Sequence, residues 1–346
     1  MRPSQLTQAI EFALINGFPL LIEGSPGVGK TAIVEQCCAK AGVELIVTHP
    51  VVSDPTDYKG LPFPVKHKRD NGEEIDAAKF LPFGDLLRCI DASRPTVFFI
   101  DDLGQAPSSV QAAIMQLLLA RRINGHRVSD KVCFMAATNG RADKAAVQGI
   151  LEPVKSRFTS IIKLEPSIED WTEWALENEM PATLIAFVKW RQNEGSNMLH
   201  DFTPSSDLVN SPSPRTVANV GNLLNAGCPD PLLYEMVRGA AGEAFAAEFL
   251  GFLRVFDQLP ALEEIIADPQ GASLPEEASQ TYAVVSALSR ATNAENIDKI
   301  YEYVCRLPVE FRVLYMKLAR RNDKAISATK TFVDFSLEFG RLIVNN

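Results

Sequence analysis

Residues 24–31 read Gly-Ser-Pro-Gly-Val-Gly-Lys-Thr, and this octapeptide constrains the fold more than any other part of the 346-residue chain. It matches the phosphate-binding pattern G-x-x-x-x-G-K-[ST], in which backbone N–H groups turn inward onto phosphate oxygens, the lysine reaches the outer phosphates and the hydroxyl holds Mg²⁺. An apolar run at 18–23 precedes it and a helical pattern at 32–40 follows it, so strand, loop and helix have the order that a nucleoside triphosphate site needs. We expect all eight residues to bind the nucleotide, namely Gly24, Ser25, Pro26, Gly27, Val28, Gly29, Lys30 and Thr31.

Apolar runs that suit buried strands recur through the first half of the chain, with helical patterns between them. This alternation predicts an α/β fold, in which a mostly parallel sheet is flanked by helices. From Ser167 onward the strand pattern disappears, and a capping serine followed by acidic residues begins a helical spacing. The expected strands are Phe18–Glu23, Glu44–Thr48, Thr96–Asp101, Lys131–Ala137 and Phe158–Leu164.

The length of the chain exceeds one comfortable core, so we expect more than one domain. The patterns place an α/β nucleotide-binding core at 1–165, an all-α lid at 166–260 and a C-terminal helical extension at 261–346. No sharp sequence signal marks the last of these boundaries. The clearest loop, Gly195–Pro214, is rich in Ser, Pro, Asn and Asp.

Composition excludes several classes of protein. The 43 acidic and 34 basic residues give a net charge of −9, which argues against coating nucleic acid through bulk charge. No apolar run is long enough to cross a membrane, and the N-terminus carries neither a secretory nor an Arg-rich transit pattern, so we expect a cytoplasmic protein. The six cysteines lack CxxC spacing and are expected to be buried apolar residues rather than disulfides or zinc ligands.

Polar side chains follow two of the expected strands. Asp101 and Asp102 end the run that begins at Thr96, at the strand edge where open α/β sheets bind ligands. We expect Asp101 to hold Mg²⁺ together with Thr31, and Asp102 to orient the water that attacks the γ-phosphate. Asn139 ends another apolar run, and its neutral amide suits both a γ-phosphate and a water. Alternatively, Asn139 only makes the turn with Gly140.

Five segments in this order resemble the MoxR-like branch of the AAA+ ATPases. The resemblance covers roughly residues 1–260, and it implies an AAA+ sheet with a helical lid, ATP and Mg²⁺ as cofactors, and ATP hydrolysis in a hexameric ring of identical subunits. It makes Asn139 the sensor-1 residue, Arg157 the finger that reaches the neighbouring subunit's nucleotide, and Arg215 the sensor-2 residue of the lid. The segments are Gly24–Thr31, Phe98–Asp102 with its continuation to Pro107, Ala136–Asn139, Glu152–Phe158 and Ser213–Thr216.

One position departs from the family pattern. The family usually has Glu after the metal-binding Asp, whereas this chain has Asp102, which is shorter by one methylene. The attacking water would then be placed less well, or a small backbone shift would bring Asp102 to it. We expect slow to normal hydrolysis, because every other catalytic position is filled.

Three further features leave alternatives open. Tyr58 and Lys59, in a Pro-bounded loop, either contact a partner near the central pore that the resemblance implies or pack on their own subunit. The Asn71-Gly72 turn predicts an exposed hairpin, either a protruding finger or a solvated loop. Three arginines have three possible roles, namely Arg121, Arg122 and Arg127. They could bind the neighbouring subunit's nucleotide, bind an acidic partner, or interact favourably with the negative end of a helix dipole.

The family resemblance implies a motor that remodels a partner protein or complex, and partners with a von Willebrand type A domain fit it. Two readings compete with this one. The first is a motor that acts on nucleic acid, against which the net charge argues. The second is a scaffold that is stabilised by ATP and scarcely hydrolyses it, because of Asp102.

Overall fold

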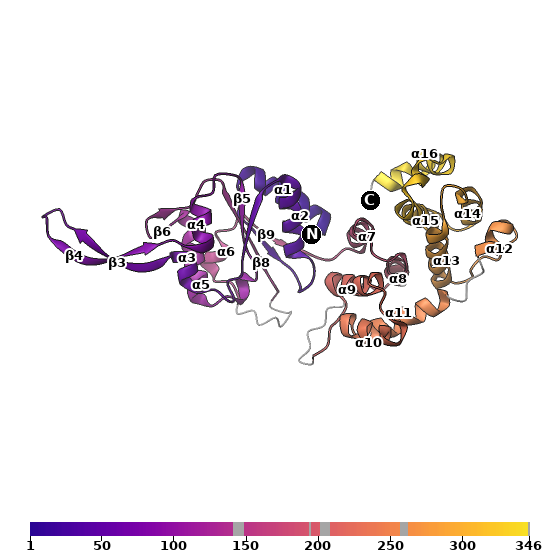
Figure 1. Ribbon diagram of the computed structural model, residues 1–346, viewed down its shortest axis with the longest axis horizontal. Coiled ribbons are helices and arrows are strands. Elements are labelled where there is room, and N and C mark those ends of the chain that lie inside the picture. Colours follow the sequence, from indigo (N-terminus) through magenta and orange to yellow (C-terminus); the bar gives the residue numbers. More distant parts are fainter. Residues whose placement is uncertain (141–148, 194, 201–207, 257–261, 345–346) are drawn as a thin grey trace. The chain divides into compact units, whose positions relative to one another are not determined.

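The sheet expected from the five apolar runs is present in the computed structural model, which describes residues 1–346 except 141–148, 194, 201–207, 257–261 and 345–346. The described residues form two units, Met1–Glu165 and Pro166–Asn346 (Figure 1). In the first unit five parallel strands lie in the order β2-β5-β8-β1-β9. The elements of this unit are α1 Pro3–Asn16, β1 Leu20–Glu23, α2 Lys30–Ala41, β2 Glu44–Thr48, α3 Pro55–Lys59, β3 Leu61–Lys68, β4 Glu74–Leu81, α4 Gly84–Ile90, β5 Thr96–Ile100, η1 Leu103–Gln105, α5 Ser108–Ala120, β6 Arg122–Ile123, β7 His126–Arg127, β8 Val132–Thr138, α6 Glu152–Lys155 and β9 Ser160–Lys163.

Alternate strand residues fill two cores, one on each face of the sheet. Phe98 and Phe134 point to one face and pack edge to face, with ring centroids 5.9 Å apart. Val97 and Met135 point to the other. Helices α1 and α2 cover the core that contains Val97, whereas α3, α4, α5 and α6 cover the core that contains Phe98. Because both faces are covered, β5 and β8 are buried along their whole length, as in other parallel sheets.

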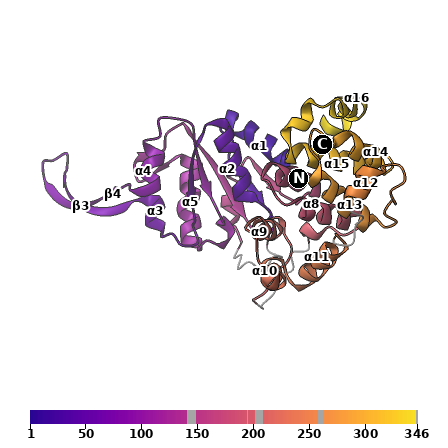
Figure 2. The same ribbon diagram turned by 45° about the vertical axis from the view of Figure 1, so that its right-hand side comes forward.

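A long two-stranded ribbon, β3–β4, extends away from the sheet of the first unit (Figures 1 and 2). Its turn lies at Asn71-Gly72, so the expected hairpin is confirmed. Two hydrogen bonds from the short hairpin β6–β7 hold its base: Asn124 Nδ2 donates to Lys59 O at 2.8 Å, and His126 Nε2 lies 2.7 Å from Phe80 O. The ribbon is therefore rooted in the body of the unit while most of its side chains face solvent.

The regular elements in the described part of the second unit are all helical (Figure 2). Phe187 lies at the centre of its core and packs against three phenylalanines of α11 with ring centroids 5.2–5.6 Å apart. Helices α8, α11 and α15 pack against α13, which joins the C-terminal helices to those before them. The predicted fold class, an α/β core followed by helices, is thus confirmed. The elements are α7 Ile168–Glu177, α8 Ala182–Asn193, η3 Met198–His200, α9 Pro214–Asn225, α10 Asp230–Ala241, α11 Glu243–Phe256, α12 Leu262–Ala267, α13 Ala278–Ala291, α14 Ile297–Val304, α15 Val309–Asn322, η4 Lys324–Ala328 and α16 Lys330–Val344.

The cysteines follow the sequence expectation in part. All six are free thiols, and Cys37, Cys38, Cys89 and Cys133 are buried in the two cores of the first unit, where burial raises the pKa of each thiol. Cys305, however, is exposed.

None of the helices in the described part of the chain has the length and apolarity that crossing a membrane requires.

Gly60, at the base of the ribbon, provides a test of how firmly the ribbon is rooted. Its backbone has φ 85° and ψ 166°, a region open essentially only to glycine, and a Cβ there would lie 2.6 Å from Leu81 O. We expect Gly60→Ala to lower the free energy of unfolding by about 2–4 kcal/mol, from backbone strain plus the clash. Gly72→Ala is the matched control, because Gly72 also has a positive φ, 88°, but no atom within 4 Å of its Cβ position. Denaturant midpoints compare the two, and equal losses would contradict the close approach at Leu81.

Candidate functional site

The octapeptide loop connects the carboxyl end of β1, which lies between β8 and β9, to the N-terminus of α2. Gly24 N–H donates to Thr138 O at 3.2 Å, which joins the start of the loop to the end of the neighbouring strand β8. Gly29, the residue before α2, has φ 103°, a left-handed conformation that lets the loop turn directly into the helix. The first N–H groups of α2 and its positive dipole end therefore face the space above the strand ends, where a phosphate is stabilised.

Lys30 is held at the mouth of this loop. Lys30 is only 6% exposed. Its ammonium group Nζ donates to Gly24 O at 2.7 Å, Ser25 O at 3.2 Å and Asn139 Oδ1 at 2.7 Å. These acceptors keep a desolvated cation satisfied and fix its position. The geometry places a compact positive charge between the loop and the end of β8.

Thr31 and Asp101 form the second contact across the strand ends. Thr31 Oγ1 donates to Asp101 Oδ2 at 2.7 Å, and Asp101 N–H donates to Thr48 O at 2.9 Å. A hydroxyl and a carboxylate oxygen this close are the hard ligands that Mg²⁺ prefers, and Mg²⁺ keeps most of its other positions for water and phosphate. The two residues fit the predicted metal site.

Asn139 links the cation to the second acid. Its Oδ1 accepts from Lys30, and its Nδ2 donates to Asp102 Oδ1 at 3.0 Å. The residue is 8% exposed. Its amide therefore does more than turn the chain toward Gly140, since it joins Lys30 on α2 to Asp102 after β5.

Asp102 lies in an unusual backbone conformation and an unusual electrostatic environment. Its φ of 55° is left-handed, which Asp and Asn tolerate better than most residues. Burial raises the pKa of its carboxyl, and the neighbouring Asp101 carboxylate raises it further. A carboxylate whose pKa is raised holds a proton more readily, a property that suits a group required to exchange one with water.

The family resemblance singles out two arginines, one in each unit. Arg157 follows α6 in the first unit, and its buried Nε has no hydrogen-bond partner among the described residues. Arg215 is exposed in the first turn of α9, in the second unit. The structure thus brings together Lys30, Thr31, Asp101, Asp102 and Asn139.

Tyr58 is buried, at 2% exposed, which agrees with the alternative that its loop packs on its own subunit. Its hydroxyl lies 2.8 Å from Thr48 Oγ1. Thr48 was missed by sequence reasoning, although a polar residue at the end of β2, on the same edge as Asp101, is a usable signal. Of the three arginines with open roles, Arg121 donates to Ser129 O and Val132 O and lies over the Phe134 ring, and Arg127 pairs with Asp130.

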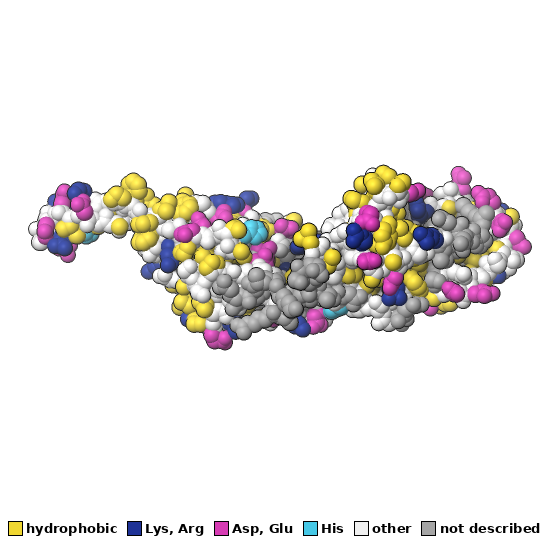
Figure 3. Space-filling model, turned by 90° about the horizontal axis from the view of Figure 1, so that it is seen from below, with side chains coloured by type: hydrophobic (Ala, Val, Ile, Leu, Met, Phe, Trp, Pro, Cys, Tyr) yellow, Lys and Arg dark blue, Asp and Glu magenta, His cyan; other side chains and the backbone are white. Residues whose placement is uncertain are grey.

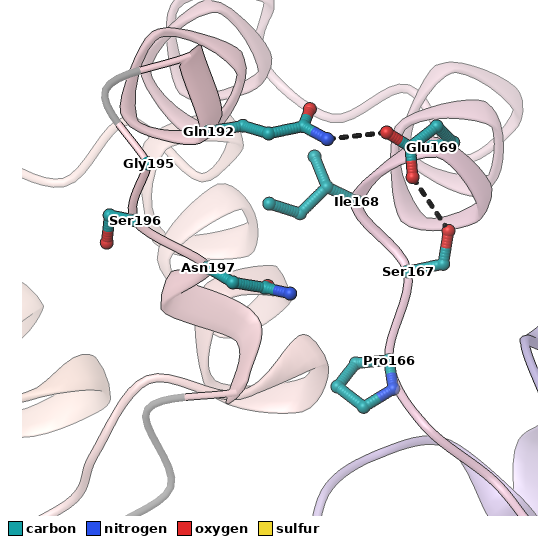
Figure 4. A pocket seen from close by; sticks show the side chains of 8 residues that line it. All are labelled: Pro166, Ser167, Ile168, Glu169, Gln192, Gly195, Ser196 and Asn197. Carbon is teal, nitrogen blue, oxygen red and sulfur yellow. Dashed lines mark hydrogen bonds between the residues drawn. The ribbon is translucent and has the colours of Figure 1, made fainter.

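Each unit also contains a cavity. One of about 360 Å³ lies beside Asn139 and is lined by Thr138, Gly149, Ile150 and Lys155. Another, of about 240 Å³, lies at the start of the second unit between Pro166–Glu169 on one side and Gln192, Gly195, Ser196 and Asn197 on the other (Figure 4). There Glu169 accepts from Ser167 Oγ at 3.0 Å and from Gln192 Nε2 at 2.5 Å, which gives the pocket a polar wall.

Residues 20–166 match the model of the ATPase family associated with various cellular activities (AAA). The match contains the loop, both acids, Asn139 and Arg157, so the matched region contains every residue of the network.

Two solved proteins resemble most of the chain at low sequence identity. The Holliday junction branch migration motor RuvB of Thermotoga maritima is 16% identical, with 88% of this chain and 85% of that chain covered and a TM-score of 0.37. NtrX from Brucella abortus is 14% identical, with 92% and 67% covered and a TM-score of 0.41. The structure of NtrX in complex with ADP is also 14% identical, with 92% of this chain and 68% of that chain covered and a TM-score of 0.35. No curated protein gave a match.

The environment of Asp102 predicts a stability change for Asp102→Asn. Because the folded pKa is raised above the unfolded value, stability is lost as the pH rises from the ordinary carboxyl range through the folded pKa, and the full cost is present at pH 7. We therefore expect Asp102→Asn to raise the melting temperature at pH 7, and to raise it less at pH 4. Melting curves of both proteins across this range measure the effect, with Asp70→Asn at the exposed ribbon turn as the control for lost charge. A gain that grows as the pH falls would contradict the pKa shift.

Proposed function

We propose that the chain is an ATP-hydrolysing motor of the MoxR-like branch, working as a ring that remodels a partner protein. The observation that carries the hydrolytic part is the connected network at the strand ends, in which Asn139 joins Lys30 to Asp102 while Thr31 joins Asp101. The phosphate-binding lysine, the metal-binding hydroxyl and carboxylate, and the acid that positions water in a P-loop enzyme each have a counterpart there.

Hydrolysis follows from how these groups are placed. Lys30 and the N–H groups of the loop hold the outer phosphates of ATP. Mg²⁺, held by Thr31 and Asp101, supplies neutralisation of phosphate charge. Asp102 accepts a hydrogen bond from the attacking water and takes up its proton as the water adds in line to the γ-phosphorus, and ADP leaves with the electrons of the bond that breaks. Asn139, bonded to both Asp102 and Lys30, keeps the acid facing the phosphate that Lys30 holds.

Ring assembly rests on Arg157 and Arg215. Arg157 is half-buried, and its buried Nε has no hydrogen-bond partner among the described residues, so we assign its guanidinium to a phosphate on the neighbouring subunit. Arg215 sits in the first turn of α9, where the helix dipole disfavours a cation. Contact with the γ-phosphate would offset that cost. The family resemblance gives both arginines these roles and supports a hexamer.

Client contact is assigned to the β3–β4 ribbon, which follows the second strand of the sheet. Along one face of it the cross-strand pairs are Leu61 with Leu81, Phe63 with Lys79, Val65 with Ala77, and His67 with Ile75, so six of these eight side chains are apolar. Figure 3 shows hydrophobic side chains along the stem of the ribbon and charges gathered at its tip. A two-stranded ribbon with an exposed apolar face is stabilised when another surface covers it. The net charge of −9 favours a protein client, which the family resemblance would give a von Willebrand type A domain, over nucleic acid.

Turnover of ATP by purified full-length protein tests the motor. We expect Asp102→Asn to bind ATP as well as the native chain does and to hydrolyse it about 10²–10⁴-fold more slowly, the usual contribution of a positioned acid or base. Lys30→Ala should lose ATP binding itself. Specific activity should rise with protein concentration, because a site completed by Arg157 exists only in the assembly. Equal rates for native chain and Asp102→Asn would remove Asp102 from the mechanism, and background rates in both would favour the scaffold.

The ribbon's apolar face gives a separate prediction about the client. In the Asp102→Asn background, which retains ATP, we expect Phe63→Ser to reduce the capture of partner proteins at least tenfold, because Phe63 is 57% exposed and its burial by a partner is worth about 1.4 kcal/mol or more. Lys68→Ser, on the opposite face of the same strand, is the matched control. Quantitative mass spectrometry of crosslinked complexes measures both. Equal capture by the two variants would place the client elsewhere.

A further inference from the structure

Gln111 is a buried polar side chain that the motifs do not explain. It lies in the first turn of α5 and is 1% exposed. A glutamine amide offers two N–H donors and a carbonyl acceptor in one plane, and burying it without partners is costly. Its partners therefore indicate what it is for.

All three hydrogen bonds of this side chain go to backbone groups of two loops. Nε2 donates to Ala106 O at 3.0 Å and to Gly149 O at 2.9 Å, and Oε1 accepts from Leu151 N–H at 2.9 Å. One backbone hydrogen bond, from Gly149 N–H to Gly104 O at 3.1 Å, joins the same two loops. The amide thus joins the loop at 104–106 to the segment at 149–151.

Each of these loops carries a residue of the proposed mechanism. The turn at 103–106 begins at Asp102, which is the residue before η1. Leu151 is the residue before α6, a helix of 4 residues that ends two residues before Arg157. So short a helix has little stability of its own, and its place is set by what holds its ends.

Two anchors hold α6 in the described structure. Val154 is fully buried in the core beneath the sheet, and Leu151 N–H is fixed by Gln111. The core contact fixes how deep α6 lies. The directional bond from Gln111 fixes where it begins, and hence where the chain carries Arg157 N–H, which donates to Val154 O at 3.1 Å.

We propose that Gln111 is a positioning residue for hydrolysis, one that ties the acid-bearing turn of a subunit to the segment by which the same subunit presents Arg157 to its neighbour. This inference rests on the proposed function, in which Arg157 acts on the adjacent nucleotide. Gln111 acts through the two loops that it joins.

Replacing the amide should separate binding from turnover. Gln111→Leu leaves the loop at 24–31 intact, so the dissociation constant for ATP should stay within twofold of the native value. Turnover should fall by about 10²-fold, the effect expected when a catalytic group shifts by about 1 Å. Gln116→Leu is the matched control, because Gln116 lies on the exposed face of the same helix and should change neither quantity. If Gln111→Leu fails to fold, Gln111→Glu replaces it, since it keeps the arm length but sets a carboxylate against two carbonyl oxygens.

Mixed assemblies then distinguish positioning from a merely structural role. Lys30→Ala subunits bind no ATP but keep Gln111 and Arg157. In excess, they should raise the turnover per Gln111→Leu subunit severalfold, by supplying a correctly placed Arg157. Subunits carrying both Lys30→Ala and Arg157→Ala should give no rise. Native chain mixed with the same excess sets the reference.

The outcomes separate this inference from the function on which it rests. If Arg157→Ala alone leaves turnover unchanged, the neighbour-acting arginine fails. If Arg157→Ala slows hydrolysis while Gln111→Leu does not, the role given to Gln111 is wrong and the proposed motor stands. If Gln111→Leu slows hydrolysis but excess Lys30→Ala does not raise it above the reference, Gln111 does not act through Arg157, and the inference is overturned.

Discussion

The side-chain amide of Asn139 is the contact on which the site depends, because it is bonded to a cation on one side and to a carboxylate on the other. A charged residue could not serve both, since it would repel one of them or compete for the metal. The two bonds are possible only because β8 lies between β1 and β5, so that the chain after β1, β5 and β8 emerges at one edge. The order of the strands therefore decides which side chains meet at the site, and the fully buried strands β5 and β8 maintain that order.

The same edge concentrates features that oppose folding. Asp102 combines a positive φ with a raised carboxyl pKa, and Lys30 is a buried ammonium. Local rules disfavour each of these, and the packing on both faces of the sheet offsets the cost. Features that are locally unfavourable and gather at one point of an otherwise regular domain are typical of a functional site. At Asp102 the left-handed backbone turns the carboxylate toward Asn139. The backbone conformation therefore matters for where the shorter side chain of Asp places its acid.

Much of this site could be predicted from the sequence, because apolar runs end at polar residues and parallel strands bring those ends together. Asp101 and Asn139 follow from that rule, and Thr31 follows from the octapeptide pattern. The buried position of Tyr58 could not be predicted, since a tyrosine in a Pro-bounded loop has no periodicity that tells inside from outside. The length of the ribbon was hidden as well, because the prolines in β3 break the alternation of a strand. Gln111 was missed because its partners are backbone groups, some of them 38 and 40 residues away.

Two polar connections lead outward from the acid-bearing turn, and they differ in kind. On one side Asp101 N–H is bonded to Thr48 O, and the hydroxyl of Thr48 meets Tyr58, two residues before the ribbon's root at Gly60. On the other side Gln111 joins the turn to Leu151. Both connections consist of hydrogen bonds between buried or half-buried groups, set in a close-packed core. The turn that holds the two acids is therefore joined by hydrogen bonds both to the root of the ribbon, the surface proposed for the client, and to the segment proposed to face the neighbouring subunit.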